Sequence, residues 1–206
     1  MRGMIGSMIL LMADSRASSC SKNPGFGWDL CYAICSMANQ NLIREHFAGY
    51  VRNFIFGVED SLVSTVGLLS GVVVGGVSQK QILLTGVVLI FVEAFSMGVG
   101  SFLSEQSAEE YVSRKSKSKK FSLVASAIMF VSYFLAGFIP LFPYIVMTPA
   151  RAFPISIIAS LLGLFVLSVV SARVLKINVT KATIRMVLMG AVAVAIGVAV
   201  GIIFKA

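Results

Sequence analysis

Two adjacent carboxylates lie inside an apolar stretch of the chain that is long enough to cross a lipid bilayer. The stretch is Phe54–Gly76, FIFGVEDSLVSTVGLLSGVVVGG, and the carboxylates are Glu59 and Asp60. A charged side chain near the middle of a membrane helix costs a few kcal/mol, so such residues are candidates for a functional site. Carboxylate oxygens bind divalent cations, which makes cation binding the first chemistry to consider.

Small residues share one helix face with Asp60. At about 100° per residue, this face carries Ser64, Gly67, Gly71 and Gly75. Glu59 points away from it. Glycines spaced by four residues let a second helix approach closely, so we expect Asp60 on a packed face rather than against lipid. The approaching helix can belong to a second subunit or to the same one, and the sequence leaves both alternatives open.

A third carboxylate, Glu93, lies in the next apolar stretch, one helical turn before Met97. Residues at i and i+4 share a helix face, and antiparallel stretches can bring Asp60 and Met97 to one depth. Carboxylate oxygen together with thioether sulfur favours a softer transition metal over Mg²⁺ or Ca²⁺. Two plainer interpretations stay open, in which Met97 fills a packing gap and Glu93 is a hydrogen-bonded structural carboxyl. The candidate metal-binding residues are therefore Asp60, Met97, Glu93 and Glu59.

Three further carboxylates follow the second apolar stretch: Glu105, Glu109 and Glu110. We expect them to continue the helix into the cytoplasm, where an acidic group would attract cations to the entrance of a pathway. The alternative is an ordinary solvated helix end. No acidic residue occurs after Glu110, so any cation chemistry by carboxylates belongs to residues 1–110.

Five apolar segments must position these residues. They run over residues 54–77, 82–103, 122–146, 154–172 and 186–204. Each is about 19–25 residues long, which as a helix spans a hydrocarbon core of about 30 Å. The chain of 206 residues is 57% hydrophobic and 13% charged, unlike a soluble domain. We therefore predict an all-α membrane protein with five transmembrane helices, in which Pro140 and Pro143 kink or unwind the outer end of the third.

The basic residues predict the orientation of these helices. Eleven lysines and arginines fall within residues 44–53 and in the second and fourth connections, against three on the opposite side. Cytoplasmic loops are rich in such residues, so the N-terminus is predicted in the cytoplasm and the C-terminus outside. The net charge of +8 is thus explained by topology and does not indicate a nucleic-acid partner.

The first 50 residues are predicted to be an extension ahead of a five-helix domain at residues 51–206. Residues 13–30 are polar and rich in turn formers, and the segment SKNPGFGWD is typical of a loop. Residues 38–53 are expected to form an amphipathic cytoplasmic segment that leads into the first span. A translation start at Met37 is an alternative to the start at Met1.

Standard enzyme signatures do not occur in the sequence. It contains no HExxH, GxSxG, Walker or GxGxxG motif, and its sole histidine, His46, precedes the first span. We therefore predict neither an enzyme nor a bound cofactor.

Three motifs, in this order, resemble the vacuolar iron transporter family. RNFIFGVEDSLVSTVGLLSGV is similar to its first span, EAFSMGVGSFLSEQSAEEY to its second and SYFLAGFIPLFPY to its third. The resemblance extends from about Arg52 to the C-terminus. It implies a five-helix homodimer that moves Fe²⁺ or Mn²⁺ out of the cytosol, commonly in exchange for protons, along a path between the subunits. Asp60 matches the family's first-span aspartate, and Met97 its second-span methionine.

The sequence also departs from the family's pattern. Glu59 stands where Asn or Ser is usual, and Ser61 replaces the usual Gly. Some members carry a second-span Glu two turns before the Met, at the position of Leu89, so Glu93 is assigned only because it shares a face with Met97. Many members have a Glu-rich metal-binding domain between spans two and three. The short connection here implies a short form, in which the entrance carboxylates are a reduced remnant.

Together, these observations and the resemblance predict a transporter whose substrate is Fe²⁺ or Mn²⁺. Two alternative functions stay open. The predicted partners are the divalent metal, the proton, the lipid bilayer and a second copy of the chain. One rival is a passive cation channel, and the other is a membrane scaffold that does not transport. We predict an integral, multi-pass membrane protein, located in the plasma membrane if the source is a prokaryote, with an endomembrane as the alternative.

Overall fold

The structure is a computed structural model that describes residues 28–113 and 119–205, with side chains described at 47–108, 110–111 and 121–205. The chain divides into two compact units, Met1–Ala48 and Gly49–Ala206. The contacts described below all belong to the second unit. Most of the polar segment at 13–30, together with residues 1–12, lies outside the described residues.

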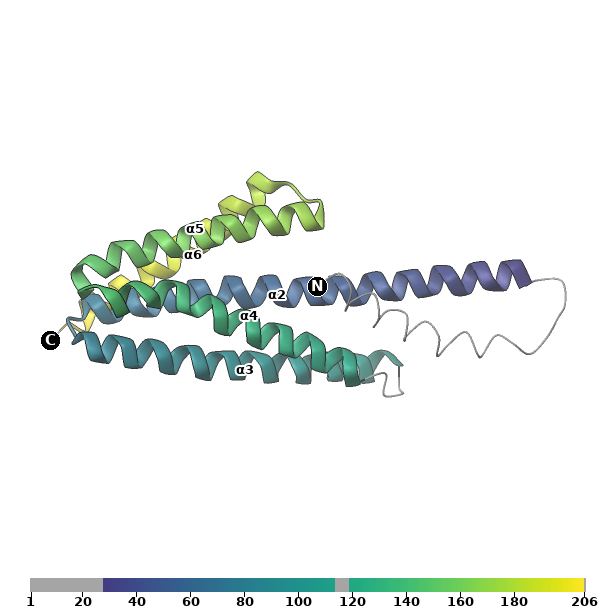
Figure 1. The fold of residues 1–206 in the computed structure, drawn as a ribbon, viewed down its shortest axis with the longest axis horizontal. Coiled ribbons are helices and arrows are strands. Elements are labelled where there is room, and N and C mark those ends of the chain that lie inside the picture. The colour runs from purple at the N-terminus through teal and green to yellow at the C-terminus, as the bar shows by residue number, and fades with distance from the viewer. Residues whose placement is uncertain (1–27, 114–118, 206) are drawn as a thin grey trace. The chain divides into compact units, whose positions relative to one another are not determined.

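Five long helices make up the described chain, and it contains no β-strand. They are α2 (Trp28–Val74), α3 (Gln79–Ser113), α4 (Lys119–Val146), α5 (Pro149–Leu175) and α6 (Val179–Ile203) (Figure 1). Each contains a segment long and apolar enough to cross a membrane; in α2 this segment is Phe47–Val74 and in α3 it is Gln79–Ala108. The prediction of an all-α protein with five spanning helices is confirmed, whereas its orientation and its dimer stay predictions.

Three local features differ from the sequence-based expectation. The segment at 38–53 and the first span form one continuous helix that already includes Trp28, at the end of the predicted loop. At its other end α2 stops at Val74, because Gly76 adopts a φ of 83°, which a helix does not allow. The third difference concerns the prolines of α4. This helix continues through Pro140 and Pro143 as far as Val146, so the expected unwinding is wrong, whereas the kink stays a prediction.

Packing explains why the prolines do not unwind α4. Proline removes one helical hydrogen bond, but the loss is local and tertiary contacts can hold the turn. Leu141 and Tyr144 flank the prolines and are 0% and 1% exposed. Ser156 of α5 donates from its hydroxyl to the carbonyl oxygen of Pro140 at 2.7 Å. The C-terminal end of α4 is thus held by its neighbours.

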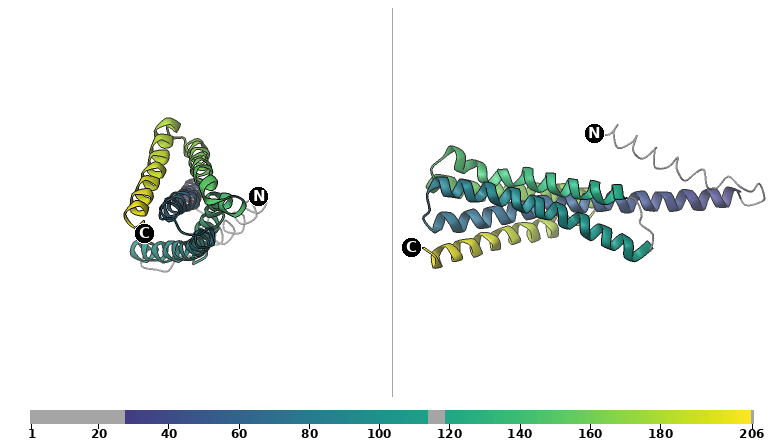
Figure 2. Two further views of the ribbon diagram at one scale, coloured as in Figure 1. Left: turned by 90° about the vertical axis from the view of Figure 1, so that its left-hand side faces the viewer. Right: turned by 90° about the horizontal axis from the view of Figure 1, so that it is seen from below.

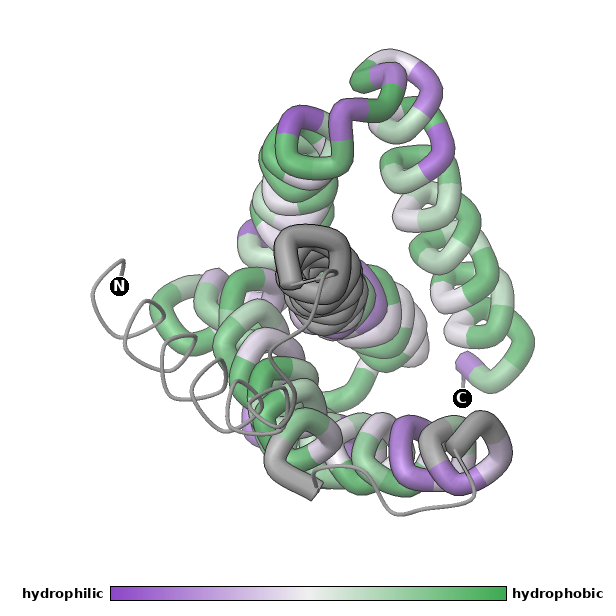
Figure 3. The backbone as a smooth tube through the Cα atoms, turned by 90° about the vertical axis from the view of Figure 1, so that its right-hand side faces the viewer, coloured by the Kyte–Doolittle hydropathy of each residue, from purple (hydrophilic) through white to green (hydrophobic). Residues whose placement is uncertain are grey.

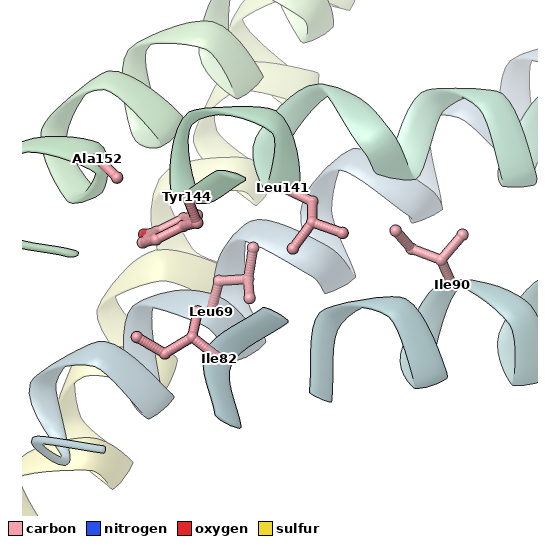
Figure 4. Packing of buried hydrophobic residues seen from close by; sticks show 6 residues of the cluster. All are labelled: Leu69, Ile82, Ile90, Leu141, Tyr144 and Ala152. Carbon is pink, nitrogen blue, oxygen red and sulfur yellow. The ribbon is translucent and has the colours of Figure 1, made fainter. Parts of the chain in front are cut away.

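The spanning part of α2 packs against each of the other four helices, and the end-on views show it among them (Figures 2 and 3). One buried cluster joins α2 to α3, α4 and α5 and consists of Leu69, Ile82, Ile90, Leu141, Tyr144 and Ala152 (Figure 4). A second joins Leu62 of α2 to Ala136 and Leu164. The helix that carries Asp60 is therefore fixed from several sides.

The glycine face of α2 meets α6 of the same chain. A Cβ added to Gly71 would lie 2.7 Å from the carbonyl oxygen of Gly197, and one added to Gly67 would lie 3.2 Å from that of Ala193. Conversely, a Cβ on Gly201 would collide with the carbonyl oxygen of Gly71. Of the two alternatives for this face, the structure shows close packing within one subunit at Gly67 and Gly71.

Candidate metal-binding site

Asp60 of α2 lies one helical turn before Ser64, which donates a hydrogen bond to the carboxylate of Glu93 on α3 at 3.1 Å, so the two carboxylates lie on neighbouring turns of adjacent helices. Both side chains are half-buried within spanning segments. The sequence placed them on different helices without showing that they meet. Two carboxylates that share a membrane site repel each other, and a cation between or beside them removes that repulsion.

Hydroxyl groups from two other helices hold the Glu93 carboxylate. Ser64 of α2 donates to its Oε2 at 3.1 Å, and Tyr133 of α4 donates to the same oxygen. The Ser64 Oγ and Tyr133 Oη atoms are themselves 2.7 Å apart. Both bonds end on Oε2, so within the described chain Oε1 stays available to a cation. The same hydrogen bonds agree equally well with the plainer interpretation, in which Glu93 is a structural carboxyl.

Tyr133 is the residue that the sequence interpretation missed. Its side chain is 0% exposed although it lies in an apolar span, and Ser61 donates to its backbone carbonyl oxygen at 2.7 Å. A buried tyrosine hydroxyl normally has a hydrogen-bond partner, which is the signal that could have drawn attention to it. Its partner is forty positions away along the chain, and no sequence spacing indicates such a pair.

Met97 lies one turn beyond Glu93 on α3 and is half-buried. The helix is tightly packed beside it, since a Cβ on Gly98 would lie 3.1 Å from the Cβ of Phe130 in α4. Among the described residues, no group of three or more His, Cys, Asp or Glu side chains could hold a metal ion. One chain thus offers two carboxylates with a thioether one turn away, and a full coordination sphere requires further ligands.

Glu59 has a different environment from Asp60. It is half-buried, and the charge of Arg185 on α6 acts on it more strongly than that of Asp60 does. The side chain of Arg185 is exposed. Glu59 is therefore placed to balance charge between α2 and α6, and its role as a metal ligand stays a prediction.

The predicted entrance carboxylates do not share one environment. Glu105 forms an ion pair with Arg52 of α2, in which Oε1 and Nη2 are 2.7 Å apart. The side chain of Glu105 is 16% exposed and that of Arg52 71%. Next to it, the amide of Asn53 donates to Ser101 Oγ at 3.1 Å. Glu110 is exposed, and the side chain of Glu109 lies outside the described residues. The ion pair joins α2 to α3, and part of the charge of Glu105 is already compensated.

Comparisons with known proteins agree with this architecture. The model of the VIT family matches residues 51–126 and 115–202. The chain is 29% identical over 93 residues to vacuolar iron transporter 1 of Tulipa gesneriana, which covers 42% of this chain and 38% of the relative. It is 31% identical over 84 residues to vacuolar iron transporter 1 of Arabidopsis thaliana, covering 40% and 34%. The matched part thus spans well under half the length of these relatives.

Proposed function

This chain belongs to the VIT family, and on that premise we propose that it is a membrane transporter of a divalent transition metal. The substrate is Fe²⁺ or Mn²⁺, which leaves the cytosol in exchange for protons. The relatives named vacuolar iron transporter support metal transport in general. The choice of metal, the direction and the proton exchange are our inference from the site and from the family resemblance.

The observation that carries the proposal is the pair of carboxylates on α2 and α3. Asp60 and Glu93 lie on adjacent helices linked by the hydrogen bond from Ser64 to Glu93, within spanning segments where each unpaired charge is costly. A divalent cation compensates both charges at once. The thioether of Met97, one turn from Glu93, favours a transition metal over the harder Mg²⁺ and Ca²⁺.

Exchange with protons follows from the same pair. When the metal has left, a proton can bind to one of the two carboxylates. The empty site then does not carry two negative charges during the return step of the transport cycle. Asp60 is the residue placed to pass between these two states, because Ser64 and Tyr133 restrain the Glu93 carboxylate. In this proposal Glu93 is the fixed ligand and Asp60 the one that exchanges.

A second copy of the chain is expected to complete the ligand set. One chain offers too few donors for the five or six ligands that Fe²⁺ and Mn²⁺ usually take. The glycines at 67 and 71 are already covered by α6, so a partner helix would approach α2 beside this contact rather than on it. The homodimer is part of the proposal and rests on the family resemblance.

The scaffold interpretation is the second candidate, and one observation favours it. The hydrogen bonds of Glu93 join α2, α3 and α4, as a purely structural carboxyl would. The two interpretations differ for Asp60, which carries no such set of bonds among the described contacts. In proteoliposomes, we expect Asp60→Asn to abolish Fe²⁺ and Mn²⁺ flux while the protein keeps its oligomeric state on size-exclusion chromatography. Normal flux in this variant would exclude Asp60 from the pathway.

A further inference from the structure

The turn between α5 and α6 carries positive charges that no carboxylate of its own hairpin balances. Three basic side chains lie within residues 173–181, and each is exposed: Arg173, Lys176 and Lys181. No acidic residue follows Glu110 in the sequence. Among the described side chains, the structure shows an ion pair between Arg52 and Glu105, which are far from this turn along the chain. We call residues 173–181 the hairpin tip.

Hydrogen bonds fix the backbone of the hairpin tip. Lys176 adopts a left-handed conformation with φ 53° and ψ 39°, and its N–H donates to the carbonyl oxygen of Ala172. The side chain of Asn178 caps α6 by accepting from the N–H of Thr180 at 3.1 Å. Below the turn, Ser168 and Thr183 join the two helices through their hydroxyls at 2.5 Å. The cations therefore project from a defined turn.

Large apolar side chains surround these cations and are also exposed. Val174, Leu175, Ile177 and Val179 are 49%, 46%, 50% and 36% exposed. The spanning segment of α5 has 27 residues, or about 40 Å of helix, against a hydrocarbon core of about 30 Å. The excess places helix ends in the headgroup layer, where cations and apolar groups both find partners.

We propose that the hairpin tip binds an anionic phospholipid. The phosphate lies against Arg173, Lys176 and Lys181, and the acyl chains cover the apolar side chains between them. A soluble anion would satisfy the cations but would leave Val174, Leu175 and Ile177 without a partner. A phospholipid satisfies both groups, which is why we favour a lipid over a free phosphate. The inference does not depend on metal transport.

The chain offers a matched control at the opposite ends of the helices. Lys80, Arg151 and Lys205 are equally basic and exposed, so replacing them changes the net charge by the same amount. The purified full chain in neutral detergent is titrated with fluorescent phosphatidylglycerol and, separately, phosphatidylcholine. Each cation near an anionic lipid contributes about fivefold to binding, so three predict a preference for phosphatidylglycerol of about 100-fold.

The triple variant Arg173→Gln, Lys176→Gln, Lys181→Gln is expected to lose this preference, and the triple variant at the opposite ends to keep it. Equal preference in both variants, or equal loss in both, would overturn the proposal. Displacement of phosphatidylglycerol by millimolar inorganic phosphate would do so too, since it would indicate a soluble-anion site. If the triple variant does not fold, Lys176→Gln is compared with Lys80→Gln, with an expected difference of about fivefold.

Discussion

The substitution Glu93→Gln separates the role of charge from the role of hydrogen bonding at the candidate site. Glutamine has nearly the shape of glutamate and keeps an oxygen that can accept from Ser64 and Tyr133. The hydrogen bonds that join α2, α3 and α4 can therefore survive. What disappears is one negative charge near Asp60. A structural carboxyl would tolerate this change, whereas a metal ligand would not.

The magnitude follows from the half-buried position of Glu93. Two unit charges about 4 Å apart interact by about 4 kcal/mol at the effective dielectric constant of roughly 20 that suits sites near a protein surface. Partial screening of a half-exposed group reduces this to about 2 kcal/mol. Every 1.4 kcal/mol is tenfold in affinity, so the half-saturating metal concentration should rise about 30-fold. Because the metal carries two positive charges, the loss of affinity should be larger than this, so about 30-fold is a lower bound.

The assay measures initial rates of Fe²⁺ and Mn²⁺ uptake into proteoliposomes over a wide range of metal concentration. The midpoint of thermal unfolding in detergent is measured in parallel and should change little. A half-saturating concentration equal to that of the unmodified protein would show that Glu93 is a structural carboxyl and not a metal ligand. A large fall in the unfolding midpoint would contradict the premise that glutamine keeps the hydrogen bonds of Glu93 to Ser64 and Tyr133.

Three further substitutions test the neighbouring contacts. Tyr133→Phe removes a hydrogen-bond donor to Glu93 and should raise the half-saturating metal concentration about tenfold. Hydrogen bonds to charged groups are worth about 1.5–3 kcal/mol, and the donor Ser64 remains. As a control, Tyr144→Phe changes an equally buried tyrosine on α4 and should leave uptake unchanged. Gly197→Ala should lower the free energy of unfolding by about 1–3 kcal/mol, because the added methyl group would collide with the carbonyl oxygen of Gly67. As a control, Gly100→Ala places its methyl group in open space and should not change thermal unfolding measurably. Met97→Leu should weaken the selectivity for Fe²⁺ over Ca²⁺ in competition uptake, and an unchanged ranking of the metals would show that the thioether is not a ligand.

The number and type of the helices were predictable because length and hydrophobicity alone decide them. A run of about twenty apolar residues has few alternatives to a spanning helix. The ends of the helices were less predictable. Helices can continue beyond the hydrocarbon core, where residues are polar, so α3 extends to Ser113 although the apolar segment ends near residue 103.

The partner of the glycine face could not be predicted from its spacing. The repeat of Gly67 and Gly71 shows that a helix comes close but not which helix it is. A matching pair occurs at Gly197 and Gly201, and the structure brings the two pairs together. Helices at opposite ends of the sequence meet here, and local pattern carries no information on such contacts.

The metal-binding role of the candidate residues stays a prediction. Asp60 and Glu93 were singled out because carboxylates are rare in apolar spans, and the structure adds that Ser64, one turn after Asp60, hydrogen-bonds to Glu93. Tyr133 was missed because aromatic residues are common in such spans, and its hydroxyl becomes informative only when its partner is known. The ion pair of Arg52 with Glu105 was missed for the same reason, since it joins two helices.

Metal uptake by proteoliposomes that hold the unmodified protein and a pH dye inside tests the central claim most directly. Fe²⁺, Mn²⁺, Ca²⁺ and Mg²⁺ are added outside in turn, and metal and proton movements are recorded together. We expect uptake of Fe²⁺ or Mn²⁺, little uptake of Ca²⁺ and Mg²⁺, and proton movement in the opposite direction. Uptake without proton movement would indicate a channel, and no uptake by a folded protein would contradict the account and favour the scaffold.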